Sequence, residues 1–293
     1  MEAEVSFYSG SHRLAGDLYV PDGLAKGERR PAIVLCCGYT GVKNLYLDDM
    51  ARRIAAAGFV ALTFDYKGWG QSEGSKLRLA PFSRVEDTQA ALTFLAPRPE
   101  VDREKLGLYG ISYGGSTATF TAAIDQRVKA VVSVTGVGHG ARWMRSVRYP
   151  WEYRELVERS LSDWEHQVVT GESELADRGE VLKLDPQSTE ISARTRSTRP
   201  GASMQVPLEM VHETIGFNPE WIVDKIAPRA SLFITSDRDE LVPPDESKSL
   251  YQHAGDPKKL VILRGYGHYE VFTPPGLDEV MDETLAWYRT YLV

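Results

Sequence analysis

A serine enclosed by glycines stands near the middle of the chain, in the segment LYGISYGGST at residues 108–117. Ser112 has Gly110 two residues before it and Gly114 two residues after it. Glycine loses more backbone freedom on folding than any other residue, so this cluster indicates a backbone too tight for side chains. The spacing, after an apolar run, is that of a nucleophile elbow, a strand-to-helix turn that exposes a serine hydroxyl. Ser112 is therefore the candidate nucleophile; the alternative is a glycine-rich turn with an incidental serine.

A serine hydroxyl attacks a carbonyl group well only when a base takes its proton. The candidate base is His268, which lies in the segment GYGHYE at 265–270, directly after a late apolar run. The other histidines fall in an expected hairpin, in an expected helix, or in the region 138–227 and its edge. A loop histidine taken alone is more often a surface residue, so this hypothesis depends on the serine and on an acid.

The candidate acids lie in the segment TSDRDELVP at 235–243, after another apolar run: Asp237, Asp239 and Glu240. A buried carboxylate behind a catalytic histidine fixes the tautomer of the ring and stabilises the imidazolium that forms. Asp237 and Asp239 are two residues apart and would share a face of an extended chain, so periodicity does not choose between them. A merely solvated acidic loop is the alternative.

The last candidate segment is LCCGYTG at 35–41, a glycine turn after an early apolar run. Attack on a carbonyl creates an oxyanion, which needs preorganised donors aimed at it. The backbone N–H of Tyr113, directly after Ser112, is one candidate donor. The backbone N–H of Tyr39, beside Gly38, is the other. A simple glycine turn without this role is the alternative.

The apolar runs that precede these segments are typical of parallel strands buried on both faces. They predict strands at 32–37, 60–65, 106–110, 130–135, 231–236 and 259–264, after a hairpin over 4–8 and 12–20. Helical periodicity predicts helices at 47–58, 83–95 and 279–291, and a further helix from Tyr113. This alternation predicts an α/β fold with a doubly wound, mostly parallel sheet. Ligands bind at the carboxyl edge of such sheets.

The alternation stops in the middle of the chain. We therefore expect a core formed by residues 1–137 and 228–293, and an inserted, mainly helical cap region at 138–227. Within it, 151–166 reads as a helix and the polar tract around 185–203 reads as a loop. The cap is rich in aromatic residues, and the expected substrate-binding side chains are Trp143, Tyr149 and Trp151. The alternative is that these aromatic residues only pack the cap onto the core. Neighbouring arginines favour a solvated basic face over a site for a carboxylate-bearing substrate: Arg142, Arg145, Arg148 and Arg154.

Over roughly 30–136 and 228–293 the chain resembles the α/β-hydrolase superfamily, including its order of serine, acid and histidine. GISYGG resembles the elbow of the dienelactone-hydrolase-like and Xaa-Pro-peptidase/acyl-esterase-like branches. DYKGWGQSEG is similar to the family's D-x-R-G-x-G-x-S-x-G, with Lys67 where arginine is usual. SDRDELVP is similar to G-x-x-D-x-x-V-P, which implies that Asp239 is the acid. GYGH resembles the family's histidine turn. CGYTG is similar to H-G-F/Y-x-G, with Cys37 in place of the histidine, which leaves the local oxyanion geometry open.

Composition narrows the class of protein. The chain has 293 residues, 42% hydrophobic residues and a formal net charge of −7. An acidic chain without a dense Lys/Arg tract is not expected to bind nucleic acid. We expect no signal peptide and no membrane span, because no apolar stretch is long enough. Two adjacent cysteines, Cys36 and Cys37, exclude a disulfide framework and suggest a cytoplasmic protein. No metal-ligand or dinucleotide motif occurs, so no metal and no cofactor are expected.

The sequence therefore predicts a serine hydrolase that cleaves a carboxylic ester, a lactone or a related acyl compound through an acyl-enzyme. Its partner is a small-molecule acyl substrate, and the sequence is compatible with a homodimer. An amidase or peptidase and a hydrolase of carbon–carbon bonds stay open, because the same three residues serve those reactions. A non-catalytic ligand-binding sensor on a hydrolase fold is the alternative from another class, since fold does not fix function.

Overall fold

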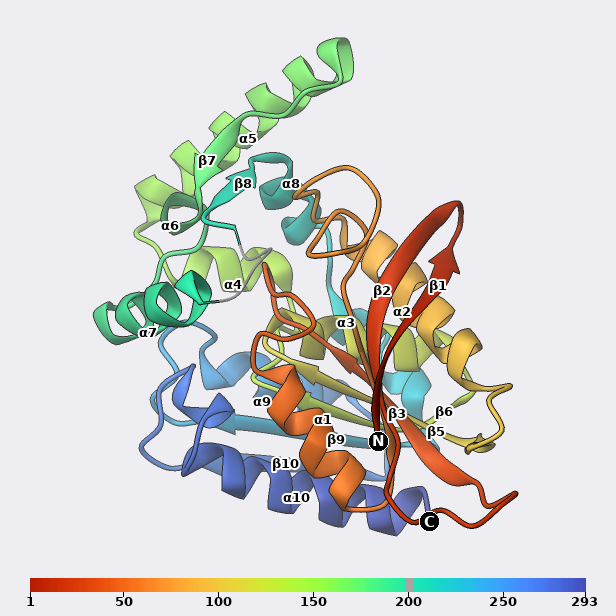
Figure 1. The fold of residues 1–293 in the computed structure, drawn as a ribbon. Helices are drawn as coiled ribbons and strands as arrows, with labels where there is room; N and C mark the ends of the chain where they lie inside the picture. Colours follow the sequence, from red (N-terminus) through yellow and green to blue (C-terminus); the bar gives the residue numbers. More distant parts are fainter. Residues whose placement is uncertain (199–202) are drawn as a thin grey trace.

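A mostly parallel β-sheet forms the centre of the molecule in the computed structural model, which describes residues 1–198 and 203–293 (Figure 1). Within that part of the chain the sheet has eight strands in the order β1-β2-β4-β3-β5-β6-β9-β10. The first two strands form the expected antiparallel hairpin, β2 pairs antiparallel with β4, and all other pairs are parallel. The strands are β1 (Glu2–Ser9), β2 (His12–Tyr19), β3 (Arg30–Cys36), β4 (Val60–Phe64), β5 (Val101–Ile111), β6 (Val128–Val134), β9 (Ala230–Ser236) and β10 (Lys258–Leu263).

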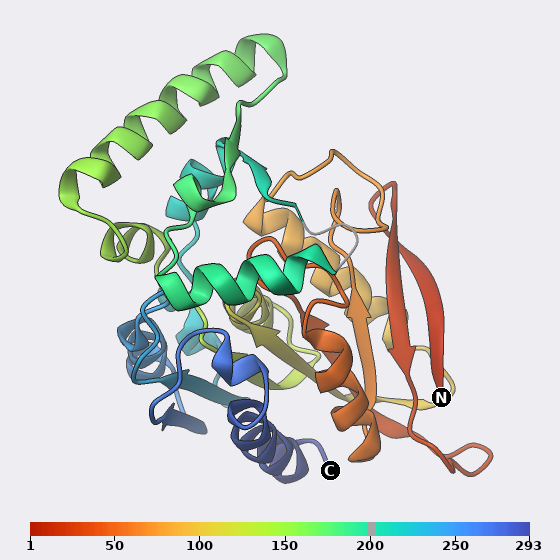
Figure 2. The same cartoon turned by 60° about the vertical axis from the view of Figure 1, so that its left-hand side comes forward.

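Helices cover both faces of this sheet, which confirms the predicted doubly wound fold. α1 (Leu47–Ala56) and α10 (Gly276–Tyr291) pack together on one face, in front of the sheet in Figure 2. On the other face, α2 (Pro81–Leu95) packs against α3 (Tyr113–Ile124), and α9 (Pro244–His253) packs on β9 and β10. Every residue of β4 and of β9 is buried. Burial on both faces explains why these strands read as continuous apolar runs.

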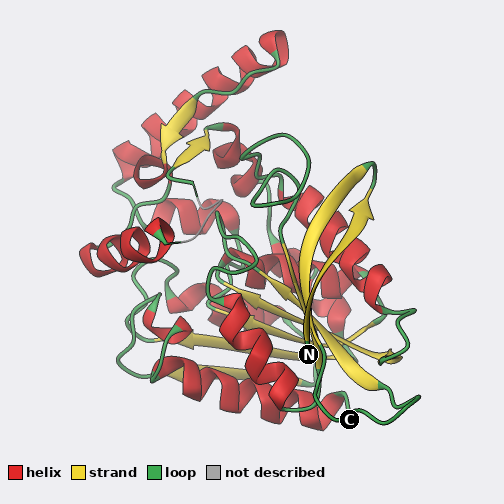
Figure 3. Cartoon of the chain, in the orientation of Figure 1, coloured by secondary structure: helices red, strands yellow, loops and turns green. Residues whose placement is uncertain are grey.

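Between β6 and β9 the chain leaves the sheet and forms a mainly helical cap (Figure 3). A short antiparallel pair of strands, β7 and β8, joins its helices. The elements of the cap are α4 (Gly140–Ser146), α5 (Pro150–Thr170), β7 (Leu175–Asp177), α6 (Arg178–Val181), α7 (Pro186–Ser197), β8 (Gln205–Pro207), α8 (Glu209–Ile215), η1 (Pro219–Trp221) and η2 (Val223–Ile226).

Helix α7 corrects the loop predicted at 185–203, of which residues 199–202 lie outside the described residues. The Asp185 side chain accepts a hydrogen bond from the Ser188 N–H at 2.9 Å, and Pro186 occupies the first turn, so both start signals of a helix are present. The buried residues of this helix are Ser188, Ser192 and Arg196, spaced four apart. A helix with a polar buried face has no apolar periodicity, and this is why the sequence pattern missed it.

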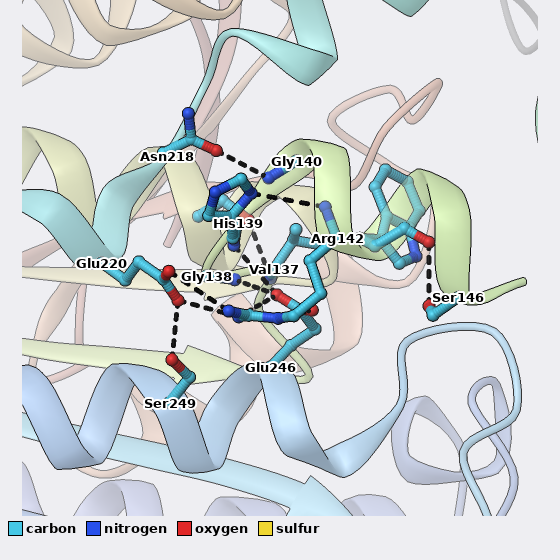
Figure 4. Close-up of polar contacts among 12 residues, drawn as sticks. Val137, Gly138, His139, Gly140, Arg142, Ser146, Asn218, Glu220, Glu246 and Ser249 are labelled. Carbon is cyan, nitrogen blue, oxygen red and sulfur yellow. Dashed lines mark hydrogen bonds and ion pairs between the residues drawn. The ribbon is translucent and has the colours of Figure 1, made fainter. Parts of the chain in front are cut away.

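The two ends of the cap lie side by side where it joins the core (Figure 4). The Glu220 N–H donates to the Gly138 carbonyl at 3.1 Å, and the Gly140 N–H donates to the Asn218 side chain at 3.1 Å. Arg142 then bridges from α4 to two carboxylates. Its Nε lies 2.7 Å from Glu246 on α9, and its Nη2 lies 2.8 Å from Glu220 on η1. One ion cluster therefore connects both ends of the cap to a core helix.

Replacing Glu220 with glutamine should destabilise this junction in a pH-dependent way. Burial raises the pKa of Glu220, but hydrogen bonds from Arg142 and Ser249 outweigh it, so the pKa lies below its ordinary value. A carboxylate with a lowered pKa in the folded protein contributes stability above its unfolded pKa of ~4.3, and that stability is lost as the pH falls through the folded pKa. We expect the free energy of unfolding of E220Q at pH 7 to be about 1–2 kcal/mol lower than that of the unchanged protein.

Chemical denaturation at pH 7 and at pH 3 measures this effect, and the difference between E220Q and the unchanged protein should shrink at the lower pH. The matched control is E155Q, because Glu155 is exposed on α5. Equal losses at both pH values would show that the carboxylate charge of Glu220 is not what stabilises the junction.

Candidate active site

Ser112 stands at a sharp turn between β5 and α3, as the elbow spacing predicts. Its backbone has φ 53° and ψ −130°, a strained conformation for a residue with a side chain. A 2.8 Å hydrogen bond from the Ser112 N–H to the Val134 carbonyl holds the turn against β6. A Cβ atom on Gly114 would collide with the Cys36 carbonyl oxygen, and one on Gly110 would collide with the carbonyl of Gly114. The glycines around Ser112 are therefore required by close backbone contacts.

The structure brings Ser112, His268 and Asp239 together. His268 Nε2 lies 3.1 Å from Ser112 Oγ, and His268 Nδ1 lies 2.7 Å from Asp239 Oδ2. The other carboxylate oxygen of Asp239 accepts hydrogen bonds from the N–H groups of Leu241 at 3.0 Å and Val242 at 2.7 Å. Both His268 and Asp239 are buried. This is the geometry of a nucleophile, a base and an acid that orients the base.

The other candidate acids have different environments. Asp237 accepts a 2.7 Å hydrogen bond from the Gly265 N–H and pairs with the exposed Arg264. The hydrogen bond from Gly265 lowers the pKa of Asp237, and the contact with Arg264 lowers it further. Glu240 is exposed. Asp237 thus fastens the start of the turn that carries His268, whereas Asp239 contacts the histidine itself.

The candidate oxyanion donors flank Ser112. Tyr113 is the first residue of α3, so its N–H has no acceptor within the helix. Gly38 approaches Ser112 so closely that an added Cβ atom would lie 3.4 Å from the serine Cβ. This contact brings the Tyr39 backbone to the nucleophile. The phenol of Tyr39 points elsewhere, since its oxygen lies 2.9 Å from the Thr214 hydroxyl on α8.

A buried arginine that the sequence analysis missed organises the turn at residues 37–39. Arg84 on α2 donates to three consecutive carbonyls, those of Cys37 at 2.6 Å, Gly38 at 2.9 Å and Tyr39 at 3.2 Å. Its guanidinium lies 3.9 Å from the centre of the Tyr66 ring. It makes no ion pair with a described residue. Because the oxygen atoms that accept hydrogen bonds from its guanidinium are all carbonyls of this turn, we infer that Arg84 sets the direction of the Tyr39 N–H.

Cys37, where the resembling family has histidine, lies against this arginine. Its thiol is buried, donates to the Gly41 carbonyl at 3.2 Å and lies 3.6 Å from Arg84 Nη2. Burial raises the pKa of Cys37 to about 12, so the thiol is neutral at physiological pH. Cys37 therefore fills space in the turn, and Arg84 supplies the hydrogen bonds that fix it.

We expect R84K to lower kcat by about 100-fold while changing KM little. A lysine ammonium lacks the planar fork that reaches several carbonyls at once, so the turn would shift, and a displacement of about 1 Å costs on this order. Steady-state kinetics on an activated ester, with a thermal unfolding curve, measures the effect. The exposed Arg103 provides the control variant R103K. A folded R84K protein with kcat within threefold of the unchanged protein would contradict the positioning role.

A narrow pocket that opens to solvent lies above Ser112, and the atom-free space in it and its mouth is about 440 Å³. Its wall combines apolar and cationic side chains from the core and the cap. Trp143 on α4 is buried in this wall, and its indole N–H donates to the Leu241 carbonyl at 2.7 Å, so the ring is fixed to the loop that carries Asp239. The lining residues are Gly38, Tyr39, Gly41, Leu45, Tyr46, Ile111, Ser112, Trp143, Arg178, Leu182, Arg196, Leu241, His268, Tyr269 and Phe272.

Two aromatic residues predicted to bind substrate do not reach this cavity. Tyr149 and Trp151 are 63% and 52% exposed, and their rings stack on each other at 4.6 Å. Pro150 between them begins α5, which extends away from the core in Figure 1. Both rings therefore lie at the surface where α4 connects to α5, and neither lines this cavity, contrary to the prediction. Trp143 is the member of that set that lines the cavity.

The arginines singled out in the sequence also lie elsewhere. Arg142 belongs to the cap junction, and Arg148 donates to the carbonyls of Met144 and Val181 within the cap. The cationic groups of the cavity are instead Arg178 and Arg196. No sequence pattern marked them. Arg178 follows a strand of only three residues, and Arg196 lies in the polar tract that was predicted to be a loop.

The described residues contain no cluster of three or more His, Cys, Asp or Glu side chains that could hold a metal ion. In the same part of the chain, no helix combines the length and the apolar character needed to cross a bilayer.

Several named proteins are similar to this chain along nearly its whole length. An uncharacterised 31.7 kDa protein from the traX-finO intergenic region of Escherichia coli is 28% identical over 283 residues, which covers 96% of this chain and 97% of that protein. The polyketide transferase claH of Penicillium crustosum is 27% identical over 292 residues, covering 95% and 94%. A thiohydrolase of Eupenicillium brefeldianum is 25% identical over 276 residues, covering 89% and 86%.

Solved structures share the fold. The α/β hydrolase GrgF from Penicillium sp. sh18 superposes with a TM-score of 0.85 at 21% identity, covering 100% of this chain and 99% of that one. DcsB, solved in complex with its substrate analogue, superposes with a TM-score of 0.87 at 23% identity and the same coverage. The family model described as "Serine aminopeptidase, S33" matches residues 27–273. The chain therefore belongs to this serine aminopeptidase S33 family and is an enzyme of the α/β-hydrolase superfamily.

Proposed function

We propose that this enzyme hydrolyses a carboxylic ester, a thioester or a lactone through an acyl-enzyme formed on Ser112. The observation that carries the proposal is the continuous contact from Ser112 through His268 to Asp239, beneath a cavity with a largely apolar wall. A strained serine within hydrogen-bond reach of a buried, carboxylate-bound imidazole is arranged for nucleophilic attack.

In the first half of the reaction, Ser112 Oγ attacks the substrate carbonyl carbon while His268 Nε2 takes the serine proton. Asp239 accepts from His268 Nδ1–H, which leaves Nε2 free to act as the base. The carbonyl oxygen becomes an oxyanion, for which the backbone N–H groups of Tyr39 and Tyr113 are the proposed donors. His268 then gives its proton to the leaving oxygen or sulfur as the bond to the carbonyl carbon breaks.

In the second half, His268 takes a proton from water, and the resulting hydroxide attacks the acyl carbon. The ester bond to Ser112 breaks, the serine recovers its proton from His268, and the carboxylic acid leaves. If an alcohol or thiol takes the place of water, the same steps transfer the acyl group instead. Each half uses one proton shuttled by His268, and the only co-reactant is the water, alcohol or thiol that accepts the acyl group.

Among the substrate classes, oxygen and sulfur esters are favoured over amides. The relatives include proteins named polyketide transferase and thiohydrolase, and the second name describes hydrolysis of a bond to sulfur. The elbow resembles both dienelactone-hydrolase-like and Xaa-Pro-peptidase/acyl-esterase-like sequences, so this resemblance is compatible with ester cleavage and with peptide cleavage. The description of the matching family as an aminopeptidase supports peptide or amide hydrolysis as the second candidate. A non-catalytic sensor is disfavoured, because ligand binding needs neither a strained serine nor a base bound to it.

Two measurements test the proposal. A fluorophosphonate probe should label the protein, and peptide mapping should find the label on Ser112. A panel of p-nitrophenyl esters, acyl thioesters, lactones and p-nitroanilides, graded by acyl size, should then show turnover of esters and thioesters well above that of anilides. If anilides are cleaved faster than esters, the enzyme is an amidase or peptidase instead. If the probe does not label Ser112, both proposals are refuted.

A further inference from the structure

Two arginines of the cap are buried in the wall of the active-site cavity. Arg178 is the first residue of α6, and Arg196 lies in the last turn of α7. Only 2% of Arg178 and 8% of Arg196 is exposed. Removing a guanidinium from water is costly unless an opposite charge compensates it, so the partners of these two groups decide what the site can bind.

The partners of Arg178 are all neutral oxygen atoms. Its Nε donates to the Thr40 hydroxyl at 2.9 Å, its Nη1 donates to the Ser192 hydroxyl at 3.4 Å, and its Nη2 donates to the Tyr269 hydroxyl at 3.3 Å. The structure shows no ion pair between Arg178 and any carboxylate of the described residues. These contacts fix the direction of the guanidinium and leave its charge uncompensated.

Arg196 has the same kind of environment. Its Nε donates to the Ser192 hydroxyl at 3.3 Å, and its Nη1 donates to the Thr40 carbonyl at 2.9 Å. No described residue accepts a hydrogen bond from its Nη2, and no described carboxylate pairs with it. Because Thr40 and Ser192 contact both arginines, the two guanidinium groups are held next to each other.

The electrostatics of this pair differ from those of the whole protein. The chain carries a formal net charge of −7, yet none of the residues that line the cavity is an aspartate or a glutamate. Burial, followed by the charge of Arg178, lowers the pKa of Arg196 to about 10, so Arg196 stays protonated at neutral pH. The cavity therefore holds two adjacent positive charges with no described counter-charge in its wall.

We propose that Arg178 and Arg196 form an anion subsite for a carboxylate or phosphate group of the substrate. The inference rests on the proposed function, because it assigns a charge to the acyl substrate of that same site. Planar guanidinium groups with free N–H donors match the oxygen atoms of such anions. The remaining wall, with Leu45, Leu182 and Phe272, suits an apolar chain. The substrate is thus an acyl compound that joins an apolar segment to an anionic end.

The subsite lies beside the reacting groups. Tyr269, which accepts from Arg178, follows His268 in the chain, and the two rings meet edge to face at 5.1 Å. An anion held by the arginines is therefore within the same small cavity as Ser112 Oγ. Its binding energy would hold the substrate carbonyl near the nucleophile, so the arginines determine specificity without taking part in proton transfer.

Kinetics on matched esters test the subsite. The p-nitrophenyl hemiesters of succinate, glutarate and adipate carry a terminal carboxylate, and p-nitrophenyl esters of neutral acids of equal length are the references. We expect the unchanged protein to favour at least one hemiester by roughly ten- to hundredfold in kcat/KM, the range of one or two charge-assisted hydrogen bonds. R196M should reduce this ratio at least tenfold. The control is R194M, because Arg194 lies exposed on the same helix and should leave the ratio unchanged.

A second measurement separates this inference from the proposed function. Glutarate and inorganic phosphate are titrated calorimetrically into S112A protein and into S112A/R196M protein, so no chemistry is involved. At least tenfold weaker binding in the double variant supports the subsite, and the tighter of the two anions identifies the group it receives. R178K, which keeps the charge but not the fork, replaces R196M if that variant does not fold.

The outcomes are distinct. Two results together would overturn the subsite and leave the serine hydrolase intact. Neutral esters would be hydrolysed as fast as hemiesters, and anion binding would be absent or unaffected by R196M. No turnover of any ester together with no labelling of Ser112 would refute the proposed function, while the titration would still decide the subsite.

Discussion

S112A should lower kcat for an activated ester by about 10⁴–10⁶-fold and leave the protein folded. The hydroxyl of Ser112 is the atom that His268 contacts, and alanine removes it while keeping a small side chain at the strained turn. Members of such a relay act as a unit, so H268A should show a loss of the same order and the double variant little more. Single-turnover kinetics and circular dichroism of the three variants measure this.

A control for S112A is S162A, because Ser162 is exposed on α5 and should leave kcat unchanged. Turnover by S112A at more than a few per cent of the unchanged rate would remove Ser112 as the nucleophile. Losses that multiply in the double variant, rather than saturating, would show that Ser112 and His268 do not act in one step.

D239N should lower kcat by about 10⁴-fold, whereas D237N should cost less than about tenfold. An amide keeps the shape of the Asp239 side chain, but its NH₂ group favours the wrong tautomer of His268. A loss of this size is expected when the acid of a serine-protease triad becomes an amide. Asp237 holds Gly265 and Arg264 at the surface, so its amide disturbs the turn and not the ring. The pair is closely matched, since both variants neutralise one aspartate in the same short loop.

The comparison has a clear failure. If D237N shows the deep loss and D239N the mild one, Asp237 is the acid and the contact between Asp239 and His268 is not used in catalysis. If neither variant loses activity, the relay ends at His268 and the carboxylate contributes only to packing. Pre-steady-state bursts with p-nitrophenyl acetate separate acylation from deacylation in both variants.

The sequence predicted the core well because the signals there are local and redundant. β4 and β9 are buried on both faces, so their residues are apolar without interruption. The glycines on either side of Ser112 predict a tight turn directly from the sequence. His268 followed from its place after a strand, and Asp239 followed from a resemblance, since Asp237 had an equal claim on spacing alone.

The parts that the sequence did not predict depend on long-range polar contacts. Arg84 looks like an ordinary charged residue of a helix, and only the folded chain shows its hydrogen bonds to the turn at 37–39. Arg196 was missed because the buried face of α7 is polar and has no apolar periodicity. Arg178 was missed because it follows a strand of only three residues. Tyr149 and Trp151 were misplaced for the converse reason: aromatic residues are not always buried, and the direction of α5 leaves these in solvent.

The adjacency of the two ends of the cap has a consequence for how such enzymes diversify. Gly138 and Glu220 are hydrogen-bonded neighbours, so the segment between them leaves and returns at a single point of the core. A different segment grafted between those two residues would only need ends that are one backbone hydrogen bond apart. Ser112, Asp239 and His268 lie outside this segment and would not have to move. We expect directed recombination in the laboratory that crosses over at these two residues to change the substrate-binding wall while keeping the core.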